Sequence, residues 1–289
     1  MPTVKYSDFK LNTLVLTEPV ENKMIPDITK YQYLSVPSVQ VDGKSEMAHI
    51  QLPWMNLSDY GIPAKNDRIG KPYLNAAGQP LTDQQRGKLK IPFNMNDTES
   101  KELYEFLTSI DKYCENEKEK IFGDKKKANV YRYQAIVRKA VQNPDAPEDA
   151  KEKPDYFVLK LDFDNKTKMV KSKIFVNKDG ERTEVTASTL DEVQKYVTYK
   201  CQFRPIMTIS KLYASRSAGG DGKRSYGLGL KLKMIEVKPV EGSSDDSEIG
   251  FIDSDVEEEK EIKQLVTETS KKEDDASKPK GRKNAKNTV

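Results

Sequence analysis

The sequence is poor in the side chains that build metal centres and covalent cross-links. Its 289 residues include two cysteines, Cys114 and Cys201, and one histidine, His49. A structural zinc site needs four cysteines, or two cysteines with two histidines, and the chain cannot supply either set. Two cysteines give no disulfide framework, so we expect both thiols to be reduced. We therefore predict no metal site and no cofactor.

Long apolar segments are missing as well. No uncharged apolar run approaches the roughly 18 residues that a membrane helix needs. The opening residues, MPTVKYSDFK, lack the apolar stretch of a secretory signal. We therefore expect an intracellular protein without a membrane partner.

The side chains needed for catalysis do not form a recognisable set. His49 is the single imidazole and lies in a strand-like segment, so no Ser–His or Cys–His pair is indicated. Asp162 and Asp164 share a face in the stretch LDFDN, but no third acidic or histidine ligand accompanies them. We expect a protein that is not an enzyme. A metal-dependent enzyme using these two carboxylates is the remote alternative.

Charged residues, by contrast, are abundant, at 33% of the chain with a net charge of +3. They are unevenly distributed, because residues 239–289 carry 14 acidic and 9 basic side chains, and the rest of the chain carries 40 basic and 32 acidic ones. A mildly basic body with a charged tail indicates a polyanionic partner.

The composition divides the chain into three predicted regions. Residues 1–28 contain three prolines and are expected to form an irregular N-terminal arm, residues 29–238 a folded domain, and residues 239–289 an acidic and then basic tail. The tail is expected to be disordered, because it cannot bury enough apolar area to offset its ordering entropy.

Inside the domain, hydrophobic periodicity predicts many strands and one long helix. Apolar residues at helical spacing run from Leu103 to Ile121, with Asn96 as the expected N-cap and Gly123 just past the end. Asp-Gly pairs at 42–43 and 179–180 indicate hairpin turns. The fold class predicted is α+β and mainly β.

Two segments are less regular. Residues 56–87 are rich in glycine and proline and are expected to form a long loop. The stretch NVYRYQAIVRKAV at 129–141 fits a strand, with a second helix as the alternative. If it is a strand, Arg132 and Arg138 share a face.

The last predicted hairpin carries the clearest functional signal. In SYGLGLKLKMIEV, residues 225–237, the alternation predicts a core face and an outer face with two glycines and two lysines, where a ligand backbone can approach closely. The residues expected in the core are Tyr226, Leu228, Leu230, Leu232 and Met234. The residues expected outside are Gly227, Gly229, Lys231 and Lys233.

Basic residues interleave with aromatic ones around this hairpin, as single-stranded nucleic acid binding requires. The candidate contact residues are Arg132, Arg138, Arg204, Tyr213, Arg216, Lys223, Arg224, Tyr226, Lys231 and Lys233. The alternative is an ordinary solvated hairpin whose lysines discourage edge pairing.

The acidic part of the tail has two interpretations. It is either a solvated linker or a functional segment that recruits a protein partner or competes for the basic body. The candidate partner-binding residues are Ile249, Phe251 and Ile252, which lie among acids in EIGFIDSD.

The stretch YVTYKCQFRPIMTISKLYAS followed by SYGLGLKLKMIEV resembles the C-terminal signature of single-stranded DNA-binding proteins of nucleocytoplasmic large DNA viruses. The earlier KYQYLSVPSVQV is similar to the first strand of that family. The resemblance implies an OB-like β-barrel with one long helix and extra hairpins. By motif position it carries over Phe203, Arg204, Tyr213 and Tyr226 as site residues.

The function implied is the non-enzymatic coating of single-stranded DNA in viral replication or repair, with replication or repair proteins as further partners. The location implied is the host cytoplasm, with packaging in the virion as the alternative. The competing hypothesis is a structural, virion or interaction protein whose acidic tail recruits a protein partner.

Overall fold

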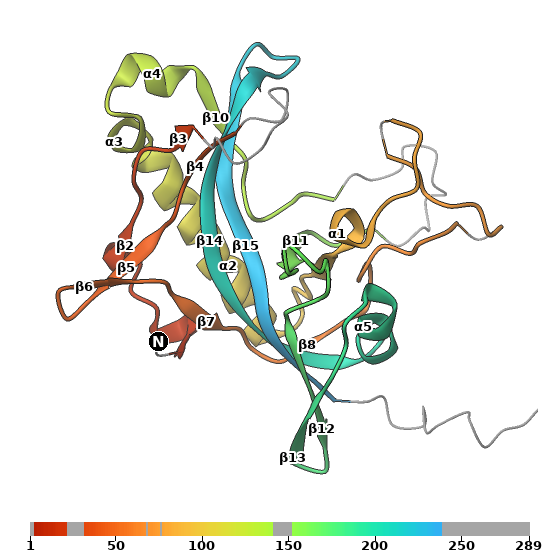
Figure 1. Ribbon diagram of the computed structural model, residues 1–289. Coiled ribbons are helices and arrows are strands. Elements are labelled where there is room, and N and C mark those ends of the chain that lie inside the picture. The colour runs from red at the N-terminus through yellow and green to blue at the C-terminus, as the bar shows by residue number, and fades with distance from the viewer. Residues whose placement is uncertain (1–2, 22–31, 68, 76, 141–151, 239–289) are drawn as a thin grey trace, which may run out of the picture. The chain divides into compact units, whose positions relative to one another are not determined.

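The computed structural model describes residues 3–21, 32–67, 69–75, 77–140 and 152–238 (Figure 1). By its internal contacts the chain divides into two units, Met1–Val240 and Glu241–Val289, and every described residue belongs to the first. The predicted tail, with Ile249, Phe251 and Ile252, lies outside the described residues.

Two long antiparallel strands, β14 (Gln202–Ala218) and β15 (Arg224–Lys238), form the spine of a 12-stranded mixed sheet (Figure 1). Short strands flank this spine on both sides. Those that pair in parallel with β15 are β10 (Tyr131–Tyr133), β11 (Tyr156–Leu161) and β12 (Lys173–Lys178). Those that pair antiparallel with β14 are β4 (Gln32–Ser35), β7 (His49–Gln51) and β8 (Met55–Asn56).

The remaining strands extend the edges or form a second, three-stranded sheet. The extensions are β1 (Thr3–Lys5) on β7, β3 (Val20–Glu21) on β4, β9 (Lys88–Pro92) on β11 and β13 (Glu181–Val185) on β12. The second sheet contains β2 (Leu14–Val15), β5 (Ser38–Val41) and β6 (Lys44–Glu46). The pairings among the described strands do not join β1 to β9, so they do not close the large sheet into a barrel.

The predicted long helix is present as α2 (Thr98–Asn116), which runs behind the β14–β15 spine (Figure 1). Leu103, Leu107 and Ile110 in its apolar stripe are fully buried. The helix begins after Asp97, one residue later than predicted, and α3 (Lys118–Phe122) follows as a separate turn. Gly123 ends α3 with a φ of 81°, the left-handed conformation that favours glycine.

The short helices are α1 (Asp83–Arg86), α4 (Lys125–Asn129) and α5 (Leu190–Tyr196). In both α1 and α5 a threonine and the residue three positions later form a reciprocal capping box, Thr82 with Gln85 and Thr189 with Glu192. The fold is therefore β-rich α+β. No helix in the described ranges combines the length and apolar character needed to cross a membrane.

Two single-residue β-bulges shape the spine, and a third register shift lies between Ala214 and Ala218 near the hairpin loop. Ile206 lies opposite Met234 and Met207 opposite Leu232, so Lys233 is an extra residue on β15. Ile209 lies opposite Leu230 and Lys211 opposite Gly229, so Ser210 is an extra residue on β14. The two single-residue bulges keep one face of the spine against the core from Phe203 to Ala214 on β14 and from Tyr226 to Val237 on β15, because each corrects the alternation of its strand.

The bulge at Lys233 overturns one prediction. Strict alternation from Tyr226 places Met234 in the core, but Met234 is 37% exposed and Ile235 is fully buried. Met234 therefore lies on the outer face of the sheet, opposite Ile206.

Two further segments differ from expectation. The predicted irregular arm contains β1, η1 (Tyr6–Asp8), η2 (Leu11–Thr13), β2 and β3 within its described residues. Among the described residues of the stretch 129–141, only β10 is a strand, and the residues after it form a loop with a single bridge from Arg138 to Tyr156.

The hairpin turn predicted at Asp42 and Gly43 is confirmed. With φ of 49° and 75°, these residues join the antiparallel strands β5 and β6.

Candidate nucleic-acid interface

The outer face of the sheet, opposite α2 and the core, collects lysines from four strands. Lys160 on β11 lies opposite Lys231 on β15 and opposite Lys88 on β9. Residues directly opposite each other in paired strands point to the same face. Leu159 and Leu161, on either side of Lys160, are buried, so Lys160 points outward with its partners. The outward cations, here called the basic face, are Lys88, Lys90, Arg138, Lys160, Lys211, Lys231 and Lys233.

These cations lie close enough to disturb one another. The pKa of Lys160 is lowered mainly by desolvation and further by the positive charges of Lys211, Lys88 and Arg138. Desolvation and the charge of Lys231 lower the pKa of Lys211. Within the described part of the chain, Lys88, Lys160 and Lys211 form no ion pair with a carboxylate. The fold thus holds like charges together without a protein counterion, and an anionic ligand would relieve their repulsion.

One carboxylate does neutralise part of this face. Asp162 accepts hydrogen bonds from Lys231 at 2.9 Å and from Lys233 at 2.7 Å. Desolvation pushes the pKa of Asp162 upward, but the hydrogen bonds and charges of Lys233 and Lys231 outweigh it, and the net pKa falls. Asp162 therefore holds both predicted lysines in fixed positions on the basic face.

Asp164, the other carboxylate of LDFDN, stabilises a turn in its own segment. It accepts backbone hydrogen bonds from Lys166 at 2.8 Å and Thr167 at 2.9 Å and so closes the turn after β11. Among the described residues no three histidine, cysteine, aspartate or glutamate side chains gather as metal ligands.

The two outward glycines of β15 are covered, contrary to expectation. A Cβ on Gly229 would lie 2.8 Å from Cγ of Lys211, because the stem of that lysine crosses it. A Cβ on Gly227 would lie 3.0 Å from Oη of Tyr213 and 2.8 Å from the carbonyl oxygen of Gln134. The space that we expected a ligand backbone to enter is thus filled by the side chains of Lys211 and Tyr213 on β14 and by the backbone of Gln134.

Aromatic rings lie beside the lysines. The Tyr156 ring has Lys90 Nζ 5.5 Å from its centroid, and the Tyr60 ring centroid lies 4.8 Å away. Tyr60 is 38% exposed, Tyr156 is half-buried, and Tyr213 is half-buried beside Gly227. The basic face therefore combines cations with ring surfaces, as single-strand binding requires.

Two predicted contact residues belong instead to the core. Phe203 and Tyr226 are fully buried, so neither presents a ring to a base. Phe203 lies opposite Val237, and the Tyr226 hydroxyl donates a 3.0 Å hydrogen bond to the carbonyl oxygen of Cys114 in α2. Burial raises the pKa of Tyr226, as expected for a phenol enclosed by the core.

The cations of the hairpin loop are less available than the sequence indicates. Arg132 on β10 pairs with Asp221 at 2.8 Å, and Arg216 pairs with Glu21 at 3.2 Å. Lys223 is exposed at the tip, and Arg224 is half-buried where the loop joins β15. The loop cations therefore lie in a separate group, and Arg138, Lys231 and Lys233 are the predicted cations that join the basic face.

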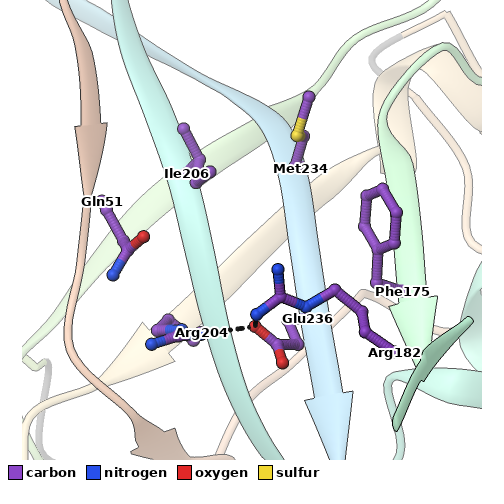
Figure 2. Close-up of a pocket in the computed structure, with 7 residues that line it drawn as sticks. All are labelled: Gln51, Phe175, Arg182, Arg204, Ile206, Met234 and Glu236. Carbon is purple, nitrogen blue, oxygen red and sulfur yellow. Dashed lines mark hydrogen bonds and ion pairs between the residues drawn. The ribbon is translucent and has the colours of Figure 1, made fainter. Parts of the chain in front are cut away.

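Arg204 lies at the far end of the outer face, in the pocket drawn in Figure 2. Its guanidinium donates to Glu236 at 2.6 Å and lies 4.8 Å from the centroid of the Trp54 ring. Arg182 on β13 reaches the same Glu236 oxygen at 3.1 Å. Desolvation raises the pKa of Glu236, but the hydrogen bonds of Asn177, Arg204 and Arg182 lower it overall.

Sequence reasoning missed Lys88, Lys90, Lys160 and Lys211. Lys88, Lys90 and Lys160 are polar members of alternating strands, as in KLKIP at 88–92 and YFVLKL at 156–161, and this signal predicts that they point away from the core. Lys211 points outward only because the bulge at Ser210 shifts the alternation of β14. The signal does not reveal that β9, β11 and β15 are neighbours, and that adjacency is what creates the cluster.

Fold and site together define a class: a β-rich α+β protein with a lysine-rich open sheet face. No protein-family model matches the chain. The chain is similar to an uncharacterized protein, R505, of Acanthamoeba polyphaga mimivirus, with 27% identity over 243 residues. The match covers 74% of this chain and 57% of that protein, so the chain spans a little over half the length of its viral relative.

Proposed function

We propose that the protein binds single-stranded DNA along the basic face, through phosphate contacts and base stacking and without catalysis. The observation that carries the proposal is the group Lys88, Lys160 and Lys211, which the fold holds together without a carboxylate partner among the described residues. Phosphates of a nucleic acid backbone would supply the missing counterions. Tyr60, Tyr156 and Tyr213 would supply stacking surfaces beside them.

The proposal extends to the context and the fold. The similarity to a mimivirus protein supports a viral context. Within that context we propose a role in the replication or repair of the DNA of a large virus, in the host cytoplasm. The two bulges that bend the long β14–β15 spine support an OB-like arrangement of the sheet, because bulges increase the bending that such folds need. Replication or repair proteins are the partners proposed for the acidic tail.

Fluorescence anisotropy with a labelled oligo(dT) of about 30 nucleotides tests the proposal. The decisive variant carries Lys88→Gln, Lys160→Gln and Lys211→Gln, and the control carries Lys10→Gln, Lys44→Gln and Lys126→Gln, which remove equal charge elsewhere. We expect wild-type affinity to fall with salt, and the decisive variant to bind at least tenfold more weakly with a salt slope shallower by about 2.

Equal loss of affinity in both triple variants would contradict the proposed binding along the basic face, because it would mean that net charge alone attracts the DNA. Absence of binding by the wild-type chain at low salt would favour the competing hypothesis, in which the protein serves as a structural or interaction component.

A further inference from the structure

A small pocket opens on the outer face where the basic face ends. The lining side chains follow the order of the strands across the outer face, from Gln51 on β7 through Ile206 on β14 and Met234 on β15 to Phe175 on β12 (Figure 2). Ile206, Met234 and Phe175 form the apolar wall of the pocket, and Met234 directly follows the bulged Lys233. The pocket is therefore continuous with the lysines of β15.

The polar end of the pocket is rigidly built. Glu236 is 8% exposed and holds Arg204 at 2.6 Å and Arg182 at 3.1 Å. Asn177 donates a further hydrogen bond to Glu236 at 2.7 Å. The guanidinium of Arg204 also lies over the Trp54 ring, so the ion pair with Glu236 and the contact with Trp54 together fix its position.

The size of the pocket restricts its occupant. Its volume of about 120 Å³ is well below the ~300–1,000 Å³ of sites for drug-sized ligands. It has room for one flat ring with apolar walls and polar groups at the edge. Arg182 and Arg204 share the single carboxylate of Glu236, so one positive charge remains beside the pocket and favours a ring attached to a negatively charged backbone.

We propose that this pocket takes one nucleobase of the DNA strand bound along the basic face. The base packs against the apolar wall formed by Ile206, Met234 and Phe175, with its polar edge toward Gln51, and Arg182 faces the adjoining phosphate. This inference rests on the proposed function and adds a place where a base, as distinct from the backbone, is held.

The test compares two labelled strands of equal length, oligo(dT) and an abasic deoxyribose phosphate strand. Phe175→Ala and Met234→Ala each remove part of the apolar wall, and Met95→Ala is the control, because Met95 is 51% exposed outside the pocket. We expect both wall variants to bind oligo(dT) about fivefold more weakly and the abasic strand within twofold of wild type. The control should bind both strands as wild type does.

The possible failures are distinguishable. If the wall variants weaken binding to both strands equally, or to neither, the pocket holds no base and the proposed function stands. If the wild-type chain binds neither strand, the proposed function fails and the inference with it. Thermal unfolding identifies a variant that does not fold, and Met234→Ala, at a 37% exposed position, then decides alone.

Discussion

The side chain of Tyr213 lies across the α-carbon of Gly227 on the neighbouring strand. The two residues are opposite each other in the β14–β15 ladder, and the phenol donates a hydrogen bond to Oε1 of Gln134. The backbone of Gln134 also approaches Gly227, so the missing side chain at 227 is what allows the segment after β10 to pack there.

Replacing Gly227 by alanine should therefore destabilise the fold. The new Cβ would lie 2.8 Å from a backbone oxygen, and overpacking of this kind costs about 1–3 kcal/mol. Gly220→Ala is the matched control, because a Cβ at Gly220 meets nothing within 4 Å. Urea unfolding should show a lower free energy of unfolding for Gly227→Ala alone, and equal stability of the two variants would contradict the packing described here.

The substitution Asp162→Asn should make the free energy of unfolding depend less on pH in the acidic range. The pKa of Asp162 in the folded state lies below its usual value of 3.8. The ionised carboxylate therefore stabilises the folded state above pH 3.8, and this stabilisation is lost as the pH falls through the pKa of the folded state. We expect the variant to be less stable by about 1 kcal/mol at pH 7, with the gap closing below pH 3.8. A gap that persists in strong acid would assign the loss to packing.

The same substitution should strengthen DNA binding under the proposed function. It removes a negative charge from the basic face and releases Lys231 and Lys233 toward a phosphate. Anisotropy at low salt should show a tighter complex, with a steeper salt dependence than wild type. Weaker binding by Asp162→Asn would show that the positions of these lysines matter more than their free charge.

Tyr226→Phe should change stability and leave binding unaltered. The buried hydroxyl donates to the Cys114 carbonyl, and loss of such a hydrogen bond costs about 1–3 kcal/mol when the acceptor stays unpaired. Because Tyr226 is fully buried, the folded variant should bind oligo(dT) as wild type does. A selective loss of DNA affinity in a stably folded variant would restore the stacking role that the sequence suggests.

A chain ending at residue 239 should bind DNA more tightly than the full chain. The removed segment carries 14 acidic and 9 basic side chains after residue 238, which compete with DNA for the basic face under the proposed function. The difference should shrink as salt is raised, because screening weakens both interactions. Identical affinities at low salt would favour a tail that acts only as a linker or as a docking peptide.

The sequence predicts the two strands of the spine better than it predicts how their residues pair. The alternation in SYGLGLKLK correctly assigns Tyr226, Leu228, Leu230 and Leu232 to the core. The helical spacing of apolar residues from Leu103 onward correctly predicts the long helix. The apolar neighbours Met234 and Ile235 break the alternation, which is the local sign of the bulge at Lys233.

The basic face is much harder to derive. Lys88, Lys160 and Lys211 are far apart in sequence, and each alone resembles an ordinary solvated strand position. Their meeting depends on long-range pairing of β9, β11, β15 and β14, which no local pattern encodes. The hairpin loop attracts attention because its cations are adjacent in sequence, although Arg132 and Arg216 are paired with acids.

The position of the spine along the chain has a consequence for biosynthesis. β14 and β15 are the last strands in the described chain, yet β4, β7, β8, β10, β11 and β12 all pair with them. During translation these six earlier strands leave the ribosome before β14 and β15 exist, so the edges that will pair with the spine stay open. The large sheet can be completed only after residue 238 has emerged, and until then these open edges expose the nascent chain to aggregation.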